Sequence, residues 1–157
     1  MSPPVRRRLR RLRLEALQWL LLALVAMLAL HVFLPLARVV PRALFWPGAG
    51  VLAAGLLLSN VAAIRLRRAG TPLETDLTPT VLLTDGVFAF SRHPVYLGML
   101  LLLAGQATML GTVGAILPWP AFWLWLHWRY IGAEERVMLA TFGEAYAQYR
   151  RRVGRWL

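Results

Sequence analysis

The sequence predicts an all-α membrane protein, a single domain over residues 1–157 with four transmembrane helices. Hydrophobic residues make up 59% of the chain and its mean hydropathy is +0.56, whereas soluble domains average about 45–50% apolar residues. Two apolar stretches, residues 17–36 and 43–64, reach the length of about 20 residues that spans a bilayer. A third stretch, residues 94–128, carries no charged side chain. These three observations favour an apolar helical bundle.

The first two helices are predicted from the first two apolar stretches and from the prolines near their ends. A basic arm, residues 1–13, precedes a first helix over about 14–36, and Pro41 follows in a short loop. The second helix is expected over about 43–66. It contains Pro47 in its first turns, where a missing N–H costs little.

A long polar connection, residues 69–94, separates the second helix from an apolar hairpin. A connection of this length in a compact protein is usually functional. The third helix is expected from Pro94 to about Leu110, and the fourth ends at about Ile131. Gly132 is expected to interrupt the helix there. The helical segments expected after this break cover about 134–142 and 144–152.

The positive charge of the chain lies at the ends of its apolar stretches. All 18 basic residues are Arg and the net charge is +11, a balance that would also suit nucleic acid binding. Arg residues that flank membrane spans instead set topology and contact anionic headgroups, so we expect membrane lipids as partners and no nucleic acid. With both termini in the cytoplasm (N-in/C-in), only Arg38 and Arg42 lie outside. We therefore expect a multi-pass protein of a bacterial inner membrane.

This topology brings the polar motifs to the cytoplasmic face. Arg92 and His93 precede Pro94 at the start of the third helix. A helix N-terminus with Pro at its first position offers free N–H groups and a positive dipole to an anionic ligand. Tyr96, three residues after His93, shares its helical face. The alternative is that Arg92 only sets the membrane topology and that His93 and Tyr96 only lie at the membrane–water interface.

Glu134 and Glu135 follow the apolar hairpin and are expected to end the fourth helix. A carboxylate at a helix C-terminus faces an unfavourable dipole and needs a partner. Arg129, Arg136 or a bound cation could serve. The alternative is a solvated surface pair.

No metal site is expected. The chain contains no cysteine, and its three histidines, His31, His93 and His127, fall on different predicted helices. Cysteine-ligated metals and thiol nucleophiles are therefore excluded. His127 lies within an aromatic run and is expected to be a packed interfacial residue.

Two runs of residues, taken together, resemble one known family. They are Leu82-Leu83-Thr84-Asp85-Gly86-Val87-Phe88-Ala89-Phe90-Ser91-Arg92-His93-Pro94-Val95-Tyr96-Leu97-Gly98, and Glu134-Glu135 followed by Leu139, Phe142-Gly143-Glu144, Tyr146 and Tyr149. The combination resembles the isoprenylcysteine carboxyl methyltransferase and phospholipid methyltransferase family. The resemblance covers about residues 69–157, which makes this range the expected catalytic core.

The resemblance implies that a methyl group passes from S-adenosylmethionine to a lipophilic acceptor that arrives through the bilayer. The cytoplasmic loop and the C-terminal helical segment would form the cofactor site. The implied cofactor-binding residues are Leu82, Leu83, Phe88, His93, Val95, Tyr96, Leu97 and Glu134. The candidates for catalytic roles are Arg129 and Glu135.

The chain departs from the isoprenylcysteine enzymes at one position. Those enzymes place an Arg four residues before the cofactor-contacting Glu, where this chain has Tyr130 and the nearest Arg is Arg129. The acceptor therefore stays open between a prenylated carboxylate, a phospholipid amine and a small thiol. A non-catalytic membrane scaffold or transport subunit with a degenerate cofactor site is the alternative from another class.

Overall fold

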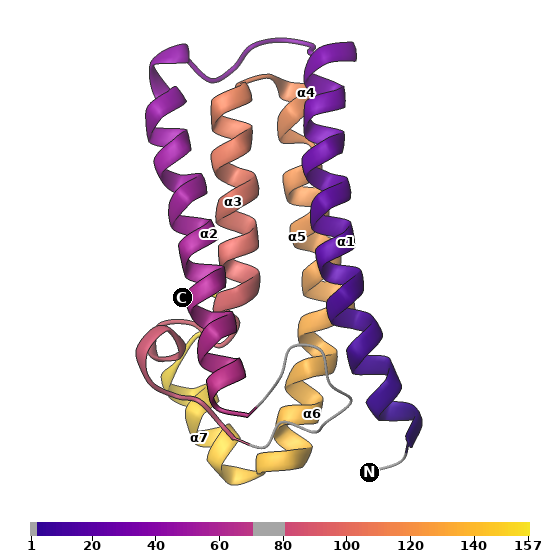
Figure 1. Cartoon of the computed structure of the whole chain (residues 1–157), viewed down its shortest axis with the longest axis vertical. Coiled ribbons are helices and arrows are strands. Elements are labelled where there is room, and N and C mark those ends of the chain that lie inside the picture. The colour runs from indigo at the N-terminus through magenta and orange to yellow at the C-terminus, as the bar shows by residue number, and fades with distance from the viewer. Residues whose placement is uncertain (1–2, 71–80) are drawn as a thin grey trace.

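The computed structural model describes residues 3–70 and 81–157. Over these ranges the regular elements are all helical, and one isolated bridge joins Arg38 to Thr112. The elements in chain order are α1 (Pro3–Phe33), η1 (Arg42–Leu44), α2 (Phe45–Arg68), η2 (Gly86–Ala89), α3 (Pro94–Leu110), α4 (Val113–Ile116), α5 (Pro118–Leu126), η3 (His127–Ile131), α6 (Gly132–Phe142) and α7 (Glu144–Arg152). The long helices run side by side as a bundle (Figure 1). The predicted all-α class is confirmed.

The helix α1 differs from its prediction at both ends. It begins at Pro3, so residues 3–13 of the expected basic arm are the first part of this helix. It ends at Phe33, three residues before the predicted end. The physical reason for the early end is Pro35, because a proline disfavours the helical conformation in the residue before it.

The helices α2 and α3 pack with their backbones in contact. The buried residues of α2 are Gly48, Gly55 and Ala62, spaced seven residues apart, and Gly48 and Gly55 face Gly105 and Gly98 of α3. A Cβ atom on Gly55 would lie 2.5 Å from the backbone nitrogen of Leu102 and 2.6 Å from the carbonyl oxygen of Gly98. Small residues permit this close approach, as they do between membrane helices.

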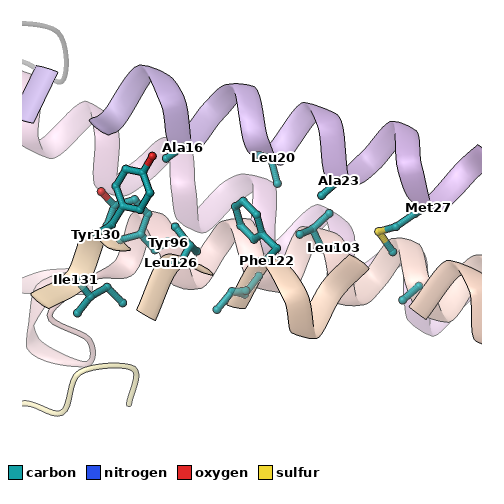
Figure 2. Packing of buried hydrophobic residues seen from close by; sticks show 12 residues of the cluster. Ala16, Leu20, Ala23, Met27, Tyr96, Leu103, Phe122, Leu126, Tyr130 and Ile131 are labelled. Carbon is teal, nitrogen blue, oxygen red and sulfur yellow. The ribbon is translucent and has the colours of Figure 1, made fainter. Parts of the chain in front are cut away.

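The helix α1 packs against α3 and α5 through one apolar face (Figure 2). Ala16, Leu20, Ala23 and Met27 recur every three or four residues and form this face. The buried side chains that they meet include Tyr96, Leu100, Leu103, Ala107, Phe122, Leu126, Tyr130 and Ile131. This core continues to the end of the bundle where the polar motifs lie.

The last long helical run differs from its prediction at Gly132. The elements α5, η3 and α6 follow one another without a break, and Gly132 keeps helical dihedral angles (φ −62°, ψ −32°). The predicted break at Gly132 is therefore wrong. Instead of a break, the run contains η3, a π-helical turn, and such turns are frequent at functional sites. Glu134 and Glu135 lie in the first turn of α6, inside the run and not at the end of a helix.

Two of the described helical segments, Ala16–Phe33 and Arg42–Arg68, are long and apolar enough to cross a membrane, and α3 is a shorter apolar helix. Large apolar side chains point outward from them, among them Val25 on α1 and Leu57 on α2. Contiguous exposed apolar surface of this kind marks a membrane or protein contact. The loop with η2, the start of α3, α6 and α7 gather at one end of the bundle (Figure 1).

Candidate active site

The start of α3 is held by a short polar turn. His93 is the N-cap residue of α3 and Pro94 occupies the first helical position, as predicted. The buried hydroxyl of Ser91 accepts a hydrogen bond from the backbone N–H of His93 at 3.2 Å. This turn directs the imidazole of His93 inward, where its side chain is 7% exposed.

The two predicted halves of the site meet at His93. Its Nδ1 lies 3.4 Å from Oε2 of Glu134, and its Nε2 lies 3.6 Å from Oε1 of Glu135. The hydroxyl of Tyr96 donates a hydrogen bond to Oε1 of Glu134 at 3.1 Å. Residues separated by about 40 positions in the sequence thus form one cluster, and the alternative of a solvated glutamate pair is wrong.

This environment shifts the pKa of His93. Burial opposes the charged imidazole, but the hydrogen bonds and negative charges of Glu134 and Glu135 outweigh burial and raise the pKa of His93 above 6.5. The cluster therefore favours a protonated His93 between two carboxylates.

Glu135 is held by two arginines. Nη1 of Arg92 lies 2.7 Å from Oε1 of Glu135. Arg155 donates from Nε to Oε1 at 3.2 Å and from Nη2 to Oε2 at 2.6 Å. Burial raises the pKa of Glu135, but hydrogen bonds from His93 and Arg155 and the charges of Arg92 and Arg155 lower that pKa to about 2. The Glu135 carboxylate is therefore ionised near neutral pH.

The loop before α3 packs on α7. Phe88 in η2 is buried, and its carbonyl oxygen accepts a hydrogen bond from the hydroxyl of Tyr149 at 2.6 Å. Burial raises the pKa of Tyr149 to about 12, so this hydroxyl stays a donor. Leu82 packs against the buried cluster of Tyr146, Tyr149 and Val153, and Leu83 is half-buried in the same loop.

The other predicted site residues lie on α3 and η3. Val95 and Leu97 flank Tyr96 and are half-buried, and the carbonyl of Val95 accepts a hydrogen bond from Ser59 of α2 at 3.0 Å. Arg129 is exposed on η3, so the structure does not bring it into the cluster of His93 and the glutamates. Tyr130, its neighbour, is fully buried against the rings of Tyr96 and Trp125.

The sequence profile of the phospholipid methyltransferase family matches residues 43–145 of this chain. The chain belongs to this family. Among curated proteins, the Protein-S-isoprenylcysteine O-methyltransferase of Schizosaccharomyces pombe (strain 972 / ATCC 24843) is 36% identical over 74 residues, which are 46% of this chain and 31% of that relative. The matched part thus spans about a third of the relative's length. No solved structure matches the chain.

In this phospholipid methyltransferase family member, the partners of the glutamates differ from those expected. Arg129 and Arg136 are exposed, and the arginines that bind Glu135 are Arg92 and Arg155. The expectation that Arg129 or Arg136 pairs with them failed because it assumed that the glutamates end a helix and pair with near neighbours on it. The bound cation, the third partner considered, stays a prediction. Their real partners come from segments that only the fold brings together.

Two residues that support the cluster were missed from the sequence. Ser91 orders the turn before α3. It lies within the first run of the resemblance, but no role was predicted for it. Arg155 follows the basic run of α7, where an arginine is readily explained by lipid headgroups. The position of Tyr149 was also part of the resemblance, although its bond to Phe88 was not predicted.

Proposed function

We propose that this chain is an S-adenosylmethionine-dependent integral-membrane methyltransferase whose acceptor is a lipophilic or membrane-partitioning molecule. The observation that carries the proposal is the buried cluster in which His93 and Tyr96 of α3 meet Glu134 and Glu135 of α6. The cluster lies at one end of an apolar bundle. The family to which the chain belongs is named for methyl transfer to phospholipids.

The donor set of the cluster fits the amino acid head of this cofactor. Within the described residues, Nε of Arg92 is buried without a hydrogen-bond partner. A buried donor left unpaired costs about 1–3 kcal/mol, so this atom favours an anionic ligand such as a carboxylate. Glu134 supplies the complementary charge for an ammonium or sulfonium group.

This fit to the cofactor suggests a role for each residue of the site. S-adenosylmethionine, when bound, supplies an activated methyl group on a sulfonium, which needs no metal. Glu134, His93 and Tyr96 would hold its polar head, and Glu135 would keep His93 protonated and oriented. The proposed apolar walls of the cofactor site are Leu82, Leu83, Phe88, Val95 and Leu97. Of the two predicted catalytic residues, Glu135 would act by positioning His93, and exposed Arg129 would contact the acceptor.

The proposed architecture in the membrane has four spans, formed by α1, α2, α3 and the run from α4 to η3. Both termini and the cluster lie on the cytoplasmic side of a bacterial inner membrane. The distribution of arginines supports this orientation, since Arg38 and Arg42 are the exceptions at the opposite end. A site at the membrane surface would take a water-soluble cofactor from one side and a lipophilic acceptor from the other.

The test is transfer of labelled methyl from S-adenosylmethionine by purified protein added to membrane lipids. The proposal expects label in the lipophilic fraction, at least tenfold above a Glu134→Ala sample. Alkali then distinguishes a carboxyl ester, from which it releases the label as volatile methanol, from N-methyl and S-methyl products, which keep the label in a non-volatile form. Absence of both transfer and cofactor binding would favour the non-catalytic scaffold.

A further inference from the structure

The segment after α7 returns to the cluster and joins its parts. The backbone N–H of Arg92 donates to the carbonyl of Gly154 at 3.1 Å. The hydroxyl of Ser91 donates to the carbonyl of Arg155 at 3.3 Å. Trp156 packs against the main core. Residues 154–156 thus lie against the turn that positions His93.

The guanidinium of Arg155 meets two further elements. Nε and Nη2 bind both oxygens of the Glu135 carboxylate, and Nη1 lies 3.3 Å from Nε2 of His127 in η3. The Arg155 side chain is 32% exposed while that of Glu135 is 6% exposed. A planar fork that binds both oxygens fixes the orientation of a carboxylate as well as its charge.

We infer that Arg155 is a positioning residue, which acts by fixing the Glu135 carboxylate beside His93. Oε1 of Glu135 faces His93 and Arg92, whereas Oε2 is held by Nη2 of Arg155. Loss of the guanidinium would free Oε2 and let the carboxylate rotate away from His93. The inference rests on the proposed function, because its readout is binding of the cofactor.

The experiment measures binding of S-adenosylhomocysteine to purified variants in detergent by calorimetry. Arg155→Gln should weaken binding by about 10-fold, which corresponds to the loss of one charge-assisted hydrogen bond. Arg155→Lys should restore part of this loss, because it keeps one charged contact. The matched control is Arg152→Gln, an exposed arginine at the end of α7, which should bind like wild type.

A double-mutant cycle with Glu135→Gln separates positioning from a general structural role. If Arg155 acts through Glu135, the double variant should bind no more weakly than Glu135→Gln alone. Losses that multiply, or a loss equal for Arg155→Gln and Arg152→Gln, would overturn the inference. Wild-type protein that does not bind S-adenosylhomocysteine would overturn the proposed function, and the inference with it.

Discussion

At the scale of single residues, the two adjacent glutamates have different partners. Glu135 lies between Arg92 and Arg155, so its charge is balanced within the protein. Glu134 accepts from Tyr96 and faces His93. A cation bound beside Glu134 would add a further favourable contact in a site where water is largely excluded.

Glu134→Ala should weaken binding of S-adenosylmethionine by about 10- to 100-fold, since charge-assisted hydrogen bonds contribute about 1.5–3 kcal/mol. Calorimetric titration in detergent measures the effect. Glu144→Ala is the control, because Glu144 pairs with Arg151 on the surface. Equal affinities of the two variants would remove Glu134 from the cofactor site.

The contribution of His93 should depend on pH. Its pKa is raised in the folded protein, so its charge stabilises the fold fully below about pH 6.5, and this stabilisation is lost as the pH rises through the folded value. The melting temperature of wild type relative to His93→Gln should therefore fall as the pH rises above about 6.5. A difference that grows with pH would contradict the ion pairs of His93.

The sequence predicted part of this cluster for a physical reason. His93 and Tyr96 share one helical face, and the glutamates follow the same apolar hairpin, so their meeting needs only two antiparallel helices. Arg155 was not predictable in this way. Its contact with Glu135 depends on how the segment after α7 folds back. This path cannot be predicted from the periodicity or spacing of residues.

At the scale of elements, the ends of α3 were predictable while the interior of the following run was not. Pro94 and Gly111 bound α3 because proline suits a helix start and Gly111 adopts φ 71° after its end. Gly132 was misread as a break, since glycine only weakens a helix and packing can retain it. The resulting π-helical turn buries Tyr130 and leaves Arg129 exposed.

The contact between α2 and α3 should be sensitive to added side-chain volume. Gly55→Ala places a Cβ atom within 2.6 Å of two backbone atoms of α3, so the helices must separate, at a cost of about 1–3 kcal/mol. Gly50→Ala on the same helix meets nothing within 4 Å and should not destabilise. Thermal unfolding in detergent compares the two, and equal melting temperatures would refute the close packing.

At the scale of the whole molecule, the start of α3, α6 and α7 lie at one end of the bundle, and the connection between α1 and α2 lies at the opposite end (Figure 1). The first of these ends carries the buried charges of the cluster. The proposed topology assigns these ends to the two sides of the membrane. Because the chain contains no cysteine, single introduced cysteines can report on each side without background.

Cysteine at Asp85 or Gln148 should resist an impermeant thiol reagent in intact cells, while cysteine at exposed Val39 should react. Both protected variants should react once the cells are opened, which controls for accessibility. Reaction of Asp85→Cys from outside would place the cluster on the other side of the membrane and contradict the orientation.

The central claim is that the start of α3 and the α6–α7 region form one cofactor site. Hydrogen exchange of the purified protein, with and without S-adenosylmethionine, tests it most directly. A ligand that binds only the folded site stabilises it by mass action, so exchange should slow together over residues 81–98 and 132–156, with little change over residues 45–60. Protection at one region alone, or at neither, would contradict the claim.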